Sequence, residues 1–211
     1  MLDGVMRKII DRPLNAVGTR LAHLGFTANA MTLFGLTLGL AAGVAIAASW
    51  FWWGVTLIVI SRLADGLDGA IARATKKTDF GGYLDISSDF MFYGAIPFGF
   101  ILSNPAANAI PGAFLLLSFY FNGGTFLGYA ILAEKHELTT EQRGIKSLYF
   151  TDGLIEGTET IAFFIVLAIW PVLFPVFSVI FALLTFATGA GRLLMAHRIF
   201  GDVSSDRIKT E

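Results

Sequence analysis

Residues 65–89 read DGLDGAIARATKKTDFGGYLDISSD and place four aspartates inside two otherwise apolar segments: Asp65, Asp68, Asp85 and Asp89. A carboxylate in the hydrocarbon core of a membrane is costly unless it is paired, hydrated or bound to a cation. The members of each pair are three or four residues apart, so each pair projects from one face of a helix. The stretch therefore predicts two antiparallel helices whose acidic side chains meet around divalent metal.

The composition is that of an integral membrane protein. The 211 residues are 55% hydrophobic, include 20 Phe and have a mean hydropathy of +0.68, whereas soluble domains are roughly 45–50% apolar. A formal net charge of -1 gives no reason to expect a nucleic-acid partner. The absence of Cys excludes disulfides, thiolate nucleophiles and Cys-based zinc sites.

Six apolar segments each approach the roughly 20 residues that cross a bilayer. They lie at about 28–49, 52–73, 82–103, 109–133, 153–170 and 172–196. The connections after the first, third and fifth segments carry no charge, and nearly all basic residues lie on the other side. By the positive-inside rule, both termini and the acidic cluster are cytoplasmic, in the inner membrane if the protein is bacterial.

Before the first segment, apolar residues recur at helical spacing with basic residues between them. We interpret residues 1–24 as an amphipathic helix on the cytoplasmic leaflet, the alternative being an ordinary packed helix. The predicted fold is all-α, with this interfacial helix, a six-helix transmembrane catalytic domain over residues 25–200 and a cytoplasmic tail over 201–211.

Small residues repeat every four positions in the first apolar segment, at Gly35, Gly39 and Gly43. Such a stripe lets another helix approach closely. The partner is either a helix of the same chain or the same helix of a second copy.

The residues of the acidic stretch also form a longer ordered pattern. Its defined positions are Asp65, Asp68, Gly69, Ala72, Arg73, Gly81, Asp85 and Asp89. The chain resembles the CDP-alcohol phosphotransferase (CDP-alcohol phosphatidyltransferase) family, whose pattern is D-x2-D-G-x2-A-R, a spacer, then G-x3-D-x3-D. Every defined position fits, although the spacer has seven residues where eight are commonest. The residues from Asn29 to Thr32 are similar to the family's P-N-x-x-T, with Ala28 in place of the proline.

The resemblance implies a membrane enzyme of phospholipid synthesis with an interfacial helix and six spans. It would transfer a phosphatidyl or other substituted phosphate group from CDP-diacylglycerol, or another CDP-alcohol, to an acceptor alcohol and release CMP. The four aspartates would hold Mg2+ or Mn2+, two ions in all, with Asp89 also the general base and Arg73 neutralising phosphate oxygens. The implied donor contacts are Asn29, Thr32, Asp65, Gly69, Ala72, Arg73 and Gly81. Family members often form homodimers, so a homodimer is a further expectation.

The acceptor is less clearly encoded. Family members that use phosphorylated acceptors carry basic residues near the position of Ile131 and at the start of the fifth span. Here that second stretch reads EGTET over 156–160, which is acidic and hydroxylic. This favours an unphosphorylated or zwitterionic acceptor over a phosphorylated one, with Glu156, Glu159 and Arg192 as candidate contacts. Alternatively, the two glutamates complement the dipole of a helix N-terminus.

Two other hypotheses account for intramembrane carboxylates. A divalent cation transporter would bind its ion near the bilayer midplane, often at a broken helix, whereas these carboxylates lie at helix ends beside basic residues. A set of buried ion pairs would need matching cations, and the nearby helices offer only Arg62 and Arg73. The enzyme is therefore the favoured interpretation.

Overall fold

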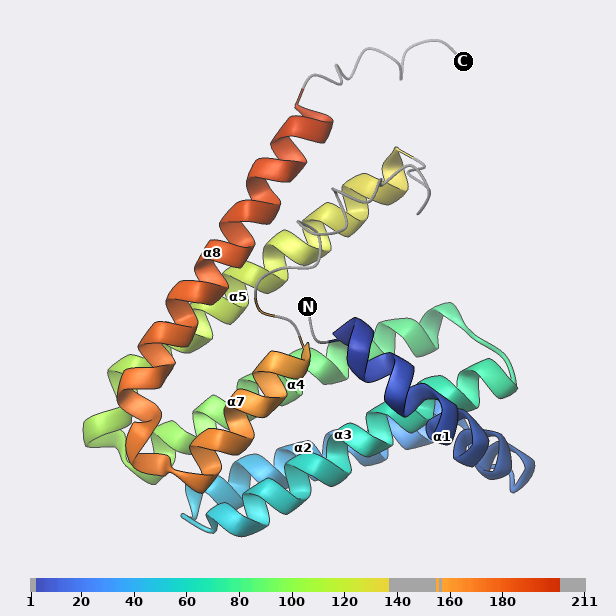
Figure 1. The fold of residues 1–211 in the computed structure, drawn as a ribbon, viewed down its shortest axis with the longest axis horizontal. Helices are drawn as coiled ribbons and strands as arrows, with labels where there is room; N and C mark the ends of the chain where they lie inside the picture. The colour runs from blue at the N-terminus through green and yellow to red at the C-terminus, as the bar shows by residue number, and fades with distance from the viewer. Residues whose placement is uncertain (1–2, 137–154, 156, 202–211) are drawn as a thin grey trace.

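The computed structural model describes residues 3–136, 155 and 157–201. Within these residues the chain is helical apart from short connections (Figure 1). The elements are α1 (Asp3–His23), α2 (Ala28–Ala47), α3 (Phe51–Ala74), α4 (Asp79–Ser103), α5 (Pro105–Lys135), α7 (Gly157–Ile169), the 3-10 turn η1 (Pro171–Leu173) and α8 (Phe174–Phe200).

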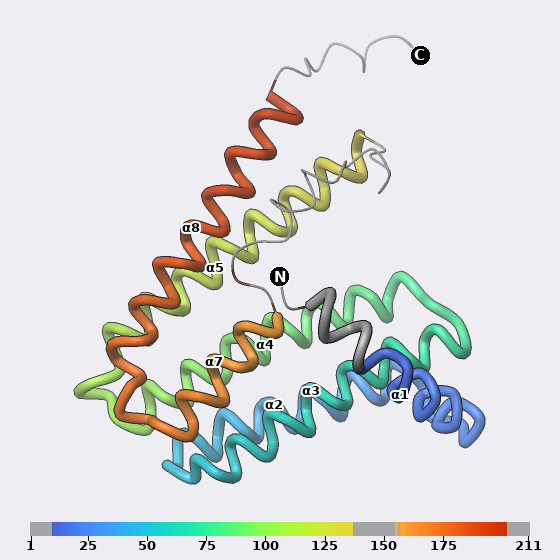
Figure 2. The backbone as a smooth tube through the Cα atoms, in the orientation of Figure 1, coloured from blue at the N-terminus to red at the C-terminus, as the bar shows by residue number. Residues whose placement is uncertain are grey.

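The helices form two groups. In the first, α2 packs against both α3 and α4, while α1 and α7 pack against α3. In the second, α5 and α8 lie along each other and lean away from the first group (Figure 1). The two groups are joined where α4 turns into α5, as the backbone trace shows (Figure 2).

Four helices of the described chain are long and apolar enough to cross a membrane: α2, α4, α5 and the combined η1–α8 segment. The helix α3 has 24 residues but carries the charged side chains of the acidic stretch. The described part of α7 has 13 residues. Large apolar side chains face outward, including Trp50, Trp52 and Trp53, which are each at least 65% exposed. The protein is therefore an integral membrane protein.

The glycine stripe of α2 faces the interior of this chain. Gly35, Gly39 and Gly43 are all buried. A Cβ on Gly35 would lie 3.3 Å from the Cβ of Ala64 in α3, and one on Gly43 would lie 2.8 Å from the carbonyl oxygen of Ala95 in α4. The prediction of close helix approach is confirmed, and the helices that approach belong to the same chain.

A cluster of aromatic rings fills the core between α4, α7 and α8. Phe92, Phe100, Phe164 and Phe174 are buried from solvent. The rings of Phe100 and Phe174 stack with centroids 4.7 Å apart and so join α4 to α8. The side-chain amide of Asn108 donates to the carbonyl oxygen of Phe100 at 2.7 Å, which satisfies a terminal acceptor of α4 from α5.

We predict that Gly99→Ala destabilises the fold. A Cβ on Gly99 would overlap the backbone of Gly43, so α2 and α4 would have to separate, and such overpacking costs about 1–3 kcal/mol. Thermal unfolding in detergent should show a lower Tm. The matched control is Gly94→Ala on the same helix, where the added methyl group meets nothing within 4 Å. Equal Tm values for the two variants would contradict the packing described here.

Candidate metal centre and phosphate cavity

Two short connections, residues 24–27 and 75–78, place the N-terminal ends of α2 and α4 close together. The helix α1 ends in a Schellman motif, with Gly25 at a φ of 89° and the Phe26 amide bonded to the Leu21 carbonyl. Thr27 then caps α2 by accepting from the amide of Ala30. Thr78 caps α4 in the same way at the amide of Gly81. Each connection is therefore tight, and each following helix begins with amide groups free to face an anion.

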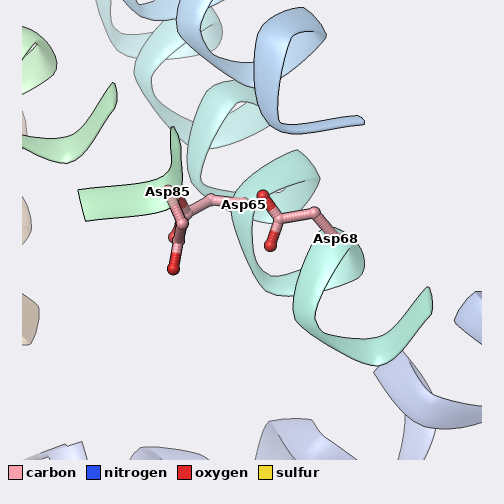
Figure 3. Close-up of side chains that lie close together, drawn as sticks. All are labelled: Asp65, Asp68 and Asp85. Carbon is pink, nitrogen blue, oxygen red and sulfur yellow. The ribbon is translucent and has the colours of Figure 1, made fainter. Parts of the chain in front are cut away.

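Three of the four acidic side chains that were predicted to converge lie together. Asp65, Asp68 and Asp85 each offer a carboxylate oxygen, and these oxygens all lie within 4.8 Å of one another (Figure 3). Asp68 is buried, and the other two are partly exposed. The hydroxyl of Thr32, from α2, donates to Oδ2 of Asp68 at 2.6 Å and fixes that carboxylate.

The fourth predicted ligand lies outside this group. Oδ1 of Asp89 is 2.7 Å from Nη1 of Arg62, and the same nitrogen is 3.4 Å from Oδ1 of Asp65. In the described part of the chain, Arg62 is the one cation in a salt bridge with any of the four aspartates. A single guanidinium leaves the cluster with excess negative charge. Three converging hard oxygen ligands with that charge fit Mg2+ or Mn2+.

A cavity of about 500 Å3 opens beside the carboxylates. Its lining contains Asp68 and Asp85 together with six of the seven predicted donor contacts, namely Asn29, Thr32, Gly69, Ala72, Arg73 and Gly81. The remaining predicted contact, Asp65, lies with Asp68 and Asp85 in the group of three carboxylates, which we call the metal group. The structure thus brings the metal group and the predicted donor contacts together on α2, α3 and α4.

Gly81 leaves room for two polar side chains at one wall of this cavity. A Cβ on Gly81 would lie 2.9 Å from the capping hydroxyl of Thr78 and 3.2 Å from Oδ1 of Asn29. A larger residue would displace the Thr78 hydroxyl or the Asn29 amide and so alter the cavity where the two N-termini meet.

Arg73 is oriented by α1. The two helices α1 and α3 cross closely, because a Cβ on Gly18 would lie 2.5 Å from the Cβ of Ala70. One turn away, Oδ1 of Asn15 accepts from both Nε and Nη2 of Arg73, at 3.1 and 2.8 Å. The acceptor is a neutral amide, so the guanidinium is held in position while its positive charge remains uncompensated.

Some residues of the cavity were not among the predicted donor contacts. Lys76 and Lys77 line it together with Arg73 and add positive charge. Their place in the turn between two acidic pairs was the signal for this role. Thr78 was also detectable, since threonine is a favoured N-cap residue. Asn15 carried no signal, because nothing in an amphipathic pattern tells which of its polar residues meets an arginine 58 positions away.

The candidate acceptor contacts lie elsewhere or outside the described residues. Glu156 is not described, and Glu159 lies in the first turn of α7, where its charge suits the helix dipole. Arg192 is 5% exposed, and its Nη1 donates to Oδ1 of Asn122 at 2.9 Å and to Oγ1 of Thr125 at 3.1 Å. It therefore lies between α5 and α8 and is absent from the cavity lining.

One known sequence is similar to most of this chain, and another is similar to about half of it. The protein is 44% identical over 181 residues to the inner membrane protein YnjF of Escherichia coli K12, which covers 86% of this chain and 82% of that protein. It is 35% identical over 98 residues to an archaetidylinositol phosphate synthase of Pyrococcus horikoshii, which covers 46% of this chain and 52% of that protein.

A solved structure shares the fold. The phosphatidylinositol phosphate synthase PgsA1 of Mycobacterium tuberculosis, crystallised with CDP-DAG bound, superimposes with a TM-score of 0.64. The match covers 95% of this chain and 98% of that one at 22% identity. A second PgsA1 structure, in complex with manganese and citrate, gives a TM-score of 0.65.

The family itself follows from the sequence match. Residues 26–191, which include every residue of the metal group and of the cavity lining, match the model of CDP-alcohol phosphatidyltransferases. The chain belongs to the CDP-alcohol phosphatidyltransferase family.

Proposed function

We propose that this protein transfers a phosphatidyl group, or another substituted phosphate, from a CDP-linked donor to an acceptor alcohol and releases CMP. The donor we infer is CDP-diacylglycerol. The observation that carries the proposal is one cavity in which two metal-binding carboxylates lie beside Arg73 and two lysines. Such a cavity suits a ligand that is both metal-bound and anionic, as a nucleoside diphosphate is. The family assignment favours this enzyme over the cation transporter.

The donor would lie across the cavity in a fixed direction. Its diphosphate would meet Arg73, Lys76 and Lys77, where charge-assisted hydrogen bonds are strongest. Its cytidine would lie against the small residues Gly69 and Ala72, which leave room for a flat ring. The N-termini of α2 and α4 add partial positive charge on the same side.

We propose that the aspartates hold two divalent ions, Mg2+ or Mn2+, with Asp65, Asp68 and Asp85 as the principal ligands and Asp89 able to contact one ion. When bound, such ions neutralise phosphate oxygens and stabilise the charge that develops on the leaving group. Hard carboxylate ligands favour these metals over softer ones.

Asp89 is the proposed general base. It would accept the proton of the acceptor hydroxyl as that oxygen bonds to the β-phosphorus of the donor. The bond from this phosphorus to the bridging oxygen then breaks, and CMP leaves with the electron pair. Arg62 holds Oδ1 of Asp89, so the second carboxylate oxygen is the one available to the proton.

The class of acceptor is open to direct test. The acidic stretch around Glu156 and Glu159 favours an unphosphorylated or zwitterionic alcohol, and the position of Arg192 outside the cavity lining agrees with that class. The names of two relatives, the archaetidylinositol phosphate and phosphatidylinositol phosphate synthases, describe phosphorylated products. Serine, glycerol, choline, glycerol phosphate and inositol phosphate form a panel that separates the classes.

We further propose six spans with α1 lying on the cytoplasmic leaflet, so that the cavity opens toward the cytoplasm. Residues 1–24 would form the interfacial helix, 25–200 the catalytic domain and 201–211 a cytoplasmic tail. The crossing of α1 over α3 and the exposed apolar residues Val17 and Leu24 support this arrangement. A homodimer in the inner membrane is part of the proposal.

We predict that Asp89→Asn lowers the rate of metal-dependent CMP release from CDP-diacylglycerol by about 10²–10⁴-fold, because an amide cannot accept the acceptor proton. The assay supplies each alcohol of the panel with labelled donor and identifies the lipid product by mass spectrometry. Asp79→Asn, an exposed residue at the start of the same helix and outside the cavity lining, should keep the wild-type rate. Absence of CMP release by the wild-type protein with every alcohol would contradict the proposed function.

We predict that Arg73→Ala weakens donor binding and leaves metal binding intact. Loss of a charge-assisted hydrogen bond costs about 1.5–3 kcal/mol, so the Kd for CDP-diacylglycerol should rise roughly 10-fold to 150-fold. Calorimetric titrations with donor and with Mn2+ measure the two effects separately. A parallel loss of Mn2+ binding would contradict the assigned role of Arg73.

We predict that two changes at Asn15 raise the KM for the donor by different amounts. Asn15→Asp would place a carboxylate beside Arg73 and compensate its charge, which should raise the KM for the donor by about tenfold. Asn15→Ala removes the hydrogen bonds that orient Arg73 but leaves the charge of Arg73 uncompensated, so we expect the KM to rise only about threefold. Steady-state kinetics at fixed Mn2+ measure both, and an Asp variant milder than the Ala variant would refute the proposed reason for a neutral partner.

A further inference from the structure

Arg62 is embedded in the acidic cluster. Its side chain is 10% exposed, and its Nη1 contacts Oδ1 of Asp89 at 2.7 Å and Oδ1 of Asp65 at 3.4 Å. One guanidinium therefore bridges a member of the metal group and the one predicted ligand outside it.

The guanidinium makes two further contacts. Its Cζ lies 3.9 Å from the ring centroid of Phe92, a residue buried from solvent in the aromatic core. Its Nη2 donates to Oγ of Ser61 at 3.3 Å. An arginine ordered by an aromatic face and a hydroxyl loses little further entropy when it binds carboxylates, so it competes well with a soluble cation.

We propose that Arg62 occupies the position at which a second divalent ion would bridge Asp65 and Asp89. The metal group Asp65, Asp68 and Asp85 then takes the first ion without displacing the guanidinium, whereas the second ion binds only by displacing it. This inference rests on the proposed function and deepens it, because it makes loading of the second ion depend on further ligands. The diphosphate of the donor supplies such oxygens.

Charge and geometry both favour a role for Arg62 in metal loading over a purely structural ion pair. A structural pair needs one carboxylate, but Arg62 contacts two: Asp65 on its own helix, α3, and Asp89 on α4. A divalent ion a few ångströms from a fixed guanidinium is strongly repelled even at an effective dielectric constant of about 20. Removing the guanidinium should therefore change metal affinity as well as stability.

The test is Mn2+ binding to the full-length protein in detergent without donor, followed by the EPR signal of free Mn2+ and by calorimetry. The wild-type protein should bind one ion tightly and a second at least about tenfold more weakly. In Arg62→Gln the second step should tighten by at least about tenfold, and the first step should tighten less. Arg62→Lys keeps the charge and should keep the second step weak.

Arg192→Gln is the matched control for loss of a buried arginine. Arg192 is also buried, but its partners Asn122 and Thr125 are neutral, and it is outside the cavity lining. Both Mn2+ steps should be unchanged in this variant. Equal tightening in Arg62→Gln and Arg192→Gln would overturn the proposal.

The remaining outcomes separate this inference from the proposed function. Wild-type protein that releases CMP, with Mn2+ binding unchanged by Arg62→Gln, overturns the role of Arg62 alone. Wild-type protein that neither binds Mn2+ nor releases CMP overturns the proposed function. If Arg62→Gln fails to fold, two equal Mn2+ steps in the wild-type protein, or a tight second step in Arg62→Lys, still contradict the proposal.

Discussion

The structure depends on the convergence of carboxylates from two helices inside a membrane protein. Asp65 and Asp68 on α3 and Asp85 on α4 repel one another, and in an apolar medium this repulsion is weakly screened. The fold holds them together by helix packing and by the guanidinium of Arg62, which contacts Asp65 on α3 and Asp89 on α4. Glycines let α2 approach both helices, and the α2 hydroxyl of Thr32 fixes Asp68. The folded chain thus maintains an acidic site whose three carboxylates fit a divalent ion.

The cavity shows the complementary arrangement for an anion. Two helix N-termini, two lysines and Arg73 surround the space beside the carboxylates. Arg73 differs from Arg62 in one respect that matters for binding. Arg62 is compensated by carboxylates, whereas Arg73 is held by the neutral Asn15 and keeps its charge available. The carboxylates that fit a cation and the basic residues that fit an anion are therefore separate, although the same few turns of helix carry both.

Much of this arrangement was predictable from the sequence, because it depends on spacing. The pattern predicted the convergence of α3 and α4, six cavity-lining residues and the packing glycines. Side-chain pairing was not predictable. The preference of Arg62 for Asp89 and that of Arg73 for Asn15 depend on the helix crossings and on rotamers. Helix limits were missed where capping decides them: α5 begins at Pro105, after the N-cap Asn104, several residues before the apolar segment predicted it.

On the proposed function, the two groups of helices suggest how the donor site and the choice of acceptor can be encoded separately. Every residue of the metal group and of the cavity lining lies on α2, α3, α4 or the connections that precede α2 and α4. The helices α5 and α8 pack on each other, with Arg192, Asn122 and Thr125 bonded between them. Changes in that second group can therefore alter polar residues without disturbing the carboxylates, since the groups meet chiefly through α4 and the aromatic core. On the proposed function, selection for a new acceptor would then act on α5 and α8 and leave the aspartate pattern unchanged.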